Sequence, residues 1–320
     1  MNLNKKVFIG LLSLLISSFS LSEELLLKNA KIHTATDRGT IEKADILIRD
    51  GMIVRIGKNI VSSRAIEKDL SGKVISPGLI APQTQLGIVE IELIPETRDD
   101  RSDIYSAGLS IDSAFNPSST LIPYNLTGGI TLSLTSPSSS GLFSGLTSAF
   151  SLSGSLEESL ISSNIALSAN ISGGEDSMAA KIQLLEDSLD LPSLVLSSYK
   201  GDLDLDRLVP EDINYSMRDL VALKRVMNKE IPLVVRANRA SDILTLIKLA
   251  ERKDINLIIN GAEEGWRVSK QLAQAKIPVI LRPIDNIPNS FNELGSRLDN
   301  AYLLHQSGVK ILIASHETHN

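Results

Sequence analysis

The sequence predicts an α/β protein whose main part is a (β/α)8 barrel. Two observations support this prediction. Short apolar runs alternate with stretches of helical periodicity through the second half of the chain, and a set of short strands joined by turns precedes them. Repeated strand–helix–strand units imply a parallel sheet with right-handed crossovers, and the number of units fits an eight-stranded barrel. A chain of 320 residues can bury such a core beside a smaller part.

Composition excludes several classes of function. The formal net charge is −6 and no basic stripe is present, so nucleic acid is not an expected partner. The chain contains no cysteine, which excludes disulfides, thiolate metal ligands and a cysteine nucleophile.

The N-terminus has the pattern of a secretory signal peptide, which we assign to residues 1–22. Lys5 and Lys6 precede an apolar, serine-containing run at residues 7–21, and Ser20 and Ser22 form a small-x-small cleavage site. The run is too short and too rich in serine to favour a membrane anchor, and no later segment has the apolar length of a membrane span. We therefore expect a periplasmic or secreted protein without membrane attachment after cleavage.

Short strands follow the signal peptide. The turn at Asp50-Gly51 joins two alternating runs and predicts a β-hairpin, and His33 is expected to be an ordinary residue of this sheet. The predicted strands lie at residues 25–27, 31–34, 44–48 and 51–57.

The first barrel strand is expected around Pro77-Gly78. Val74, Ile75, Leu79 and Ile80 predict a short, fully buried strand, and the alternating Gln83 and Gln85 that follow it should point to the same side.

A polar loop at residues 90–117 comes next, and it contains an acidic run with interspersed arginines at residues 96–103. Such a run could line a pocket or hold a cation, but a solvated face is the favoured interpretation.

Strands and helices alternate through the rest of the chain. A strand followed by its loop is predicted at residues 128–137. Further strands are predicted at residues 147–152, 165–171, 233–235, 255–259, 278–281 and 309–314, and helices at residues 175–189, 240–252 and 263–275. His305 falls on the helix expected before the last strand.

The chemistry of a barrel lies at the carboxyl ends of its strands. Arg236 and Asn238 follow one predicted strand, and Asn260 follows the next. Serines at residues 136–140 supply hydroxyls, but no His–Asp pair that would activate one is evident, so no catalytic residue is assigned.

These stretches resemble the amidohydrolase superfamily, especially its imidazolonepropionase-like periplasmic branch. The matching residues are Pro77, Gly78, Leu79, Ile80 and Gly87 in the first stretch, the Gly128 to Pro137 stretch, and Arg239, Ala240, Asp242 and Ile243 in the third. The stretch from Asn260 to Gly265 is similar to a further motif of that branch.

The resemblance implies that residues 23–72 are part of a small β-sandwich and that residues 73–320 are the barrel. In the family, the barrel is followed by a further helix and by returning sandwich strands. The resemblance therefore implies a chain that is truncated after barrel strand eight.

The resemblance also implies replaced metal ligands. Gln83, Gln85, Asn238 and Asn260 stand where the family has histidines that hold zinc, iron or manganese, and Arg236 stands at a further histidine position of the third motif. Amides are much weaker ligands for these metals than imidazole, so we expect no metal and no other cofactor.

The C-terminal stretch at residues 310–320 lacks the aspartate that the family carries after strand eight, and Ser315 and His316 occupy its neighbourhood. His316, Glu317 and His319 could form a small metal cluster, but this is not the favoured interpretation.

Two functions remain open at this point. The resemblance implies a hydrolase acting on carbon–nitrogen bonds other than peptide bonds, such as those of cyclic amides. The residues themselves favour a metal-free, inactive relative that binds a small polar molecule or a partner protein.

Overall fold

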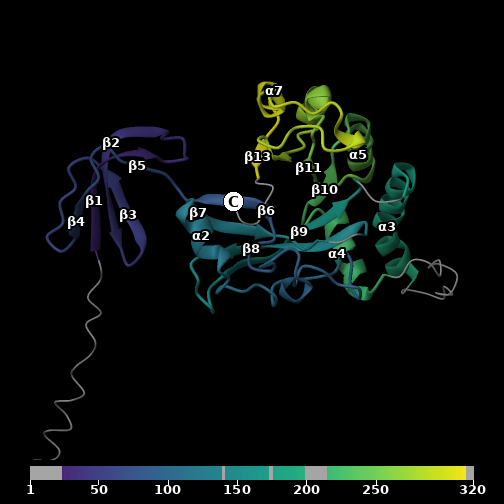
Figure 1. The fold of residues 1–320 in the computed structure, drawn as a ribbon, viewed down its shortest axis with the longest axis horizontal. Helices are drawn as coiled ribbons and strands as arrows, with labels where there is room; N and C mark the ends of the chain where they lie inside the picture. Colours follow the sequence, from purple (N-terminus) through teal and green to yellow (C-terminus); the bar gives the residue numbers. More distant parts are fainter. Residues whose placement is uncertain (1–23, 139–140, 173–175, 199–214, 315–320) are drawn as a thin grey trace, which may run out of the picture. The chain divides into compact units, whose positions relative to one another are not determined.

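The computed structural model describes residues 24–138, 141–172, 176–198 and 215–314. The chain divides into two compact units, Met1–Pro77 and Gly78–Asn320 (Figure 1). The predicted signal peptide at residues 1–22 lies outside the described residues. Within the described residues, no helix has both the length and the apolar character needed to cross a membrane.

The N-terminal unit contains a five-stranded sheet with the strand order β3-β2-β1-β4, in which β5 also pairs with β1. Its core is formed by Ala30, Ile32, Ala44 and Ile46, which are almost completely buried. The strands are β1 (Glu24–His33), β2 (Thr40–Arg49), β3 (Met52–Gly57), β4 (Ile66–Asp69) and β5 (Val74–Ile75). The predicted all-β part is thus confirmed, whereas β4 was not anticipated.

The predicted hairpin joins β2 to β3. Arg49 pairs with Met52, so the loop is the two residues Asp50 and Gly51, whose φ values are 49° and 75°. A two-residue type I′ turn requires positive φ at both positions, and its backbone twist matches the right-handed twist of the two strands. His33 ends β1 as an exposed residue, and its Nδ1 lies 2.7 Å from Thr40 Oγ1, in agreement with a structural role.

The C-terminal unit contains an eight-stranded sheet with the strand order β13-β12-β11-β10-β9-β8-β7-β6. Because β13 also lies beside β6, the sheet is nearly closed into a barrel. The strands are β6 (Leu79–Thr84), β7 (Ile130–Thr135), β8 (Phe143–Ser151), β9 (Leu160–Asn170), β10 (Leu233–Ala237), β11 (Leu257–Gly261), β12 (Val279–Leu281) and β13 (Ile311–Ile313). The predicted barrel is therefore confirmed.

One strand departs from the expected parallel arrangement. β8 runs antiparallel to both β7 and β9, whereas the other neighbouring pairs are parallel. The short connections on either side of β8 leave no room for a crossover helix, and antiparallel neighbours need none. The prediction of a wholly parallel sheet was wrong for this strand.

The helices that pack against the sheet lie mostly in the second half of the chain, as Figure 1 shows. Leu185, Leu223 and Ile243, from three successive helices, belong to one core with Val235 and Ile259 of the sheet. The described helices are α2 (Leu121–Thr127), α3 (Met178–Ser198), α4 (Met217–Met227), α5 (Ala240–Lys253), α6 (Ser269–Gln274) and α7 (Asn300–Gln306), with short 3-10 turns η1 (Pro95–Thr97), η3 (Gly265–Val268) and η4 (Phe291–Glu293). The helix predicted at 263–275 begins later than expected, and His305 lies on α7 as predicted.

Asp219 in the first turn of α4 ties this helix to a distant loop. Its carboxylate accepts hydrogen bonds from the backbone N–H groups of Ser106 (3.0 Å), Gly108 (2.6 Å) and Ser216 (2.8 Å), and from the Ser216 hydroxyl (2.7 Å). The Ser216 hydroxyl oxygen accepts a hydrogen bond from the Asp219 N–H, and the two reciprocal bonds form a capping box. The side chain is only 1% exposed, so one buried carboxylate holds both segments.

The predicted buried strand around Pro77-Gly78 is wrong in two respects. Val74 and Ile75 form β5 of the N-terminal sheet, whereas Leu79 and Ile80 begin β6 of the barrel sheet, so the stretch is two strands. Leu79 and Ile80 are also more than half exposed. Among the described strands, β6 is hydrogen-bonded to β7 and ends the strand order, so it has one hydrogen-bonded neighbour where a central strand has two.

Candidate functional site

Polar residues follow an apolar layer inside the barrel. Val234, Ile258 and Ile280 belong to one cluster on the face of the sheet opposite to the helices. Because side chains alternate along a strand, Arg236 lies on the same face as Val234, and Asn260 on the same face as Ile258. Arg236 pairs in register with both Asn260 of β11 and Asn170 of β9. The structure thus brings Arg236 and Asn260 together at the carboxyl ends of their strands.

Asn238 follows β10 directly and is 3% exposed. Its Nδ2 donates to Glu293 Oε1 at 2.6 Å, whereas its Oδ1 is buried without a hydrogen-bond partner among the described residues. Gly261 approaches this amide so closely that an added Cβ would lie 2.1 Å from Asn238 Oδ1. The position, with φ of +99°, therefore requires glycine on two grounds.

Glu263 and Arg282 lie at the same end of the sheet, after β11 and β12. Glu263 Oε2 and Arg282 Nε are both buried and have no hydrogen-bond partner among the described residues. Burial and the neighbouring Glu293 raise the pKa of Glu263 to about 7, although Arg282 and Arg236 oppose the change. Burial, together with the charge of Arg236, lowers the pKa of Arg282.

The loop at residues 282–299 is fastened next to these groups. Asn286 donates through Nδ2 to the carbonyls of Glu263 (3.2 Å) and Arg297 (2.8 Å). Glu264 Oε1 accepts the Gly295 N–H at 2.8 Å, and Trp266 Nε1 donates to the Gly295 carbonyl at 2.8 Å. Bonds at both ends therefore fix the loop that carries Glu293.

The guanidinium groups of two arginines lie over the ring of Trp266. The guanidinium carbons of Arg267 and Arg297 lie 5.0 Å and 4.8 Å from the centre of its ring. Both distances fall within the range of cation–π attraction, which adds to the hydrogen bond from the indole.

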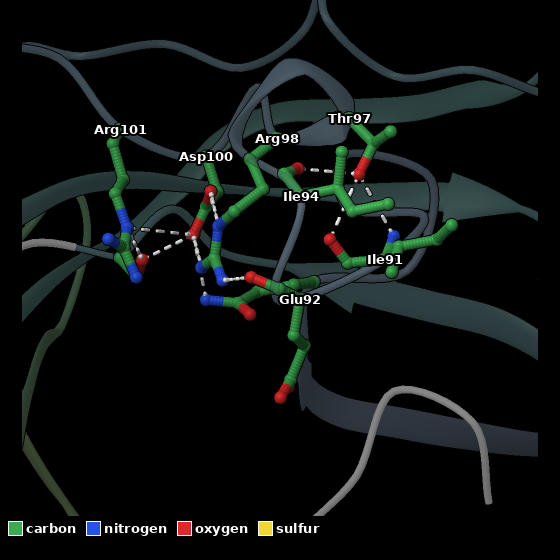
Figure 2. Close-up of polar contacts among 9 residues, drawn as sticks. Ile91, Glu92, Ile94, Thr97, Arg98, Asp100 and Arg101 are labelled. Carbon is green, nitrogen blue, oxygen red and sulfur yellow. Dashed lines mark hydrogen bonds and ion pairs between the residues drawn. The ribbon is translucent and has the colours of Figure 1, made fainter.

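Gln85 is engaged elsewhere. It follows β6 and donates through Nε2 to Asp100 Oδ2 at 3.1 Å. Arg98 binds the same carboxylate with Nε at 3.1 Å and Nη2 at 2.8 Å, and the Ser138 hydroxyl donates to it as well. Figure 2 shows Asp100 between Arg98 and Arg101, with Arg98 also donating to the Glu92 carbonyl. Gln85 thus contributes to the anchor of a loop.

The solvated face predicted for the acidic run is wrong at one position. Glu96, Asp99 and Asp103 are exposed as expected, but Asp100 is completely buried. Its bidentate contact with Arg98 and the two further donors supply the partners that a buried charge requires. Gln83, near the end of β6, is half-buried.

Ser136, one of the serines expected to supply hydroxyls, forms a buried chain of hydroxyl groups with residues of β8 and β9. Ser136 Oγ lies 2.7 Å from Thr147 Oγ1, which lies 3.2 Å from Ser168 Oγ. The hydroxyls partner one another, so they stabilise the β7–β9 side of the sheet.

The metal-ligand chemistry of the site can be judged from its residues. Gln83, Gln85, Asn238 and Asn260 offer neutral amides, and Arg236 offers a cation, which is a poor donor set for zinc, iron or manganese. Among the described ranges, no group of three or more His, Asp or Glu side chains is placed to hold a metal ion. Ser315, His316, Glu317 and His319 lie outside the described residues.

A separate hollow of about 510 Å³ lies at the opposite end of the strands. Pro232, Asn256 and Pro278, which line it, each directly precede β10, β11 or β12. This is the amino end of the sheet, where barrels carry residues for stability and not for chemistry. We therefore place the candidate site at the carboxyl ends.

Sequence reasoning missed Glu263, Arg282 and Glu293. Arg282 was open to detection because it directly follows a predicted strand. Glu263 was assigned to the start of a helix, and Glu293 reaches the site through the loop, which no local pattern indicates.

The chain has the fold of an amidohydrolase, as the resemblance of its motifs predicts. An amidohydrolase from Thermotoga maritima has a similar structure, with a TM-score of 0.78 and 24% identity, over 92% of this chain and 79% of that one. No protein-family model matches the sequence.

Two curated proteins are similar over shorter stretches. D-hydantoinase from Geobacillus stearothermophilus is 39% identical over 102 residues, which are 32% of this chain and 20% of the hydantoinase. A dihydroorotase from Bacillus cytotoxicus is 46% identical over 44 residues, which are 14% of this chain and 10% of the dihydroorotase. The matched part thus spans a fifth or less of these relatives.

Proposed function

We propose that this amidohydrolase-like protein binds a small polar molecule of the cyclic amide class at the carboxyl ends of β10, β11 and β12, without a metal ion. The observation that carries the proposal is a set of three buried atoms without partners among the described residues: Asn238 Oδ1, Glu263 Oε2 and Arg282 Nε. A buried polar atom without a partner is costly and needs an explanation. A ligand that completes these bonds provides one.

The three atoms specify the ligand's hydrogen-bonding groups. Asn238 Oδ1 and an ionised Glu263 accept hydrogen bonds, and Arg282 donates one. A cyclic ureide has two N–H donors and a carbonyl acceptor, which is the complementary set. The similar proteins D-hydantoinase and dihydroorotase are named for substrates of this type.

The donor set supports binding more than metal-dependent hydrolysis. Amides and guanidinium groups orient a ligand by hydrogen bonds, but they do not lower the pKa of a water molecule as a metal ion does. We therefore assign no catalytic step to a metal ion.

The test is the affinity of the full chain for hydantoin and 5,6-dihydrouracil, measured by calorimetry and by thermal stabilisation. We expect both compounds to bind, and a lactone of similar ring size, which lacks N–H donors, to bind much more weakly. Arg282→Gln should weaken binding of the ureides about 10- to 100-fold, because it removes a charged donor. Arg252→Gln, on the exposed surface of α5, is the matched control and should bind like the wild type. Equal binding by Arg282→Gln and wild type would contradict this assignment.

Hydrolysis of the carbon–nitrogen bond of a cyclic amide is the second candidate. The 39% identity with D-hydantoinase over 102 residues favours it. Hydantoin turnover that stops with a chelator and returns with zinc would replace the metal-free proposal with this one. Absence of turnover together with ureide binding would support the binding function.

A further inference from the structure

Glu263 has a fixed backbone and an unengaged carboxyl oxygen. Asn286 Nδ2 donates to the Glu263 carbonyl, and Asn300 Nδ2 donates to the carbonyl of Ala262 at 2.9 Å. The residue is 8% exposed, and its Oε2 has no partner among the described residues. The backbone of Glu263 is thus held in place, while one oxygen of its carboxyl group has no partner in the part of the chain that the structure describes.

The charged groups around Glu263 come from three segments. Arg236 belongs to β10, Arg282 and Asp285 follow β12, and Glu293 belongs to η4. Glu293 is already committed, because Oε1 accepts from Asn238 and Oε2 accepts the Asn289 N–H at 3.2 Å. Burial and the neighbouring carboxylate of Glu293 disfavour the ionised form of Glu263, whose Oε2 has no donor among the described residues.

We propose that Glu263 is a ligand-contacting residue that must lose its proton for a cyclic ureide to bind, so that it makes binding depend on pH. On binding, the O–H bond of the Glu263 carboxyl group breaks and the proton passes to solvent. The freed Oε2 then accepts an N–H of the ligand, beside Asn238 Oδ1 and Arg282 Nε. This inference rests on the proposed function and adds a proton-linked residue to that site.

The pKa of Glu263, raised to about 7, places this exchange in an accessible range. Below that pH the protein must release a proton to bind, so affinity should rise with pH and level off above it. The limiting slope is about tenfold in affinity for each pH unit.

The experiment measures hydantoin affinity by calorimetry from pH 5.5 to 8.5 for the wild type, Glu263→Gln and Glu251→Gln. We expect the wild type and Glu251→Gln, which changes an exposed residue of α5, to bind more tightly as the pH rises to about 7. Glu263→Gln keeps an acceptor oxygen but cannot titrate, so its affinity should not change with pH. In two buffers of different ionisation enthalpy below pH 7, the wild type should show proton release on binding and Glu263→Gln none.

A second measurement needs no ligand. Because the folded chain binds the Glu263 proton more tightly than the unfolded chain does, this residue makes wild-type stability fall between about pH 4.5 and pH 7. Urea denaturation across this pH range should show that the free energy of unfolding of the wild type falls relative to that of Glu263→Gln, which lacks the titrating group.

The outcomes separate the two proposals. If hydantoin binds wild type equally at every pH, or more tightly at low pH, the proton-linked contact is overturned while the binding function stands. If the denaturation profiles differ as expected but no ureide binds at any pH, the binding function fails and the ligand contact fails with it. Parallel denaturation profiles would overturn the role of Glu263 as the titrating group.

Discussion

Asp100→Ala is expected to destabilise the barrel unit by about 3–5 kcal/mol, which is the usual cost of removing one partner of a buried ion pair. The carboxylate is completely buried and receives donors from Arg98, Gln85 and Ser138. Its removal leaves the Arg98 guanidinium, which is only 14% exposed, without its charged partner. The loop after β6 and the start of the β7–β8 connection lose their common anchor at the same time.

The measurement for Asp100→Ala is urea or thermal denaturation of the full chain, followed by circular dichroism. Asp99→Ala is the matched control, because Asp99 is the exposed neighbour in the same acidic run. It should change stability by no more than about 0.5 kcal/mol. A loss below about 1 kcal/mol for Asp100→Ala would contradict the anchoring role, since that is the range of a surface pair.

Asp219→Ala is expected to cost about 3 kcal/mol, because it removes the acceptor of several buried donors at once. The backbone N–H groups of Ser106 and Gly108 would lose their partner in a place that water does not reach easily. The cap of α4 would be lost as well.

Ser216→Ala separates the two roles of Asp219. It removes the capping hydroxyl but leaves the Asp219 bonds to the 106–108 segment, so it should cost only about 1 kcal/mol. Denaturation of both variants gives the comparison. Equal losses in the two would mean that Asp219 acts as a helix cap alone and does not hold the distant loop.

The strands and most helices of the barrel could be predicted because their apolar residues repeat at fixed periods. The direction of β8 could not, since the same residues form a strand whichever way it runs, and only the lengths of its connections decide it. The apolar character of both halves of residues 74–80 predicts one strand. Their separation into β5 and β6 depends on pairing with β1 and β7, which no local pattern contains.

The candidate site likewise contains residues that local sequence patterns predict and residues that they do not. Arg236, Asn238 and Asn260 were identified because they directly follow predicted strands. The burial of Asp100 was missed because a charge run looks the same whether its members face water or an arginine. Glu293 accepts a hydrogen bond from Asn238, which lies 55 positions earlier in the sequence. A contact between residues so far apart in the sequence can be seen only in the folded chain.

The contacts of Trp266 make this residue an intrinsic optical probe. The chain has one tryptophan, so its intrinsic fluorescence arises at the place where the 282–299 loop is fastened to the barrel. The indole donates a hydrogen bond to the Gly295 carbonyl, and two guanidinium groups lie over its ring. Both the polarity and the packing around the ring would change if the loop moved. A shift in emission on adding a compound therefore reports on that loop directly, in the unmodified protein and without an attached dye.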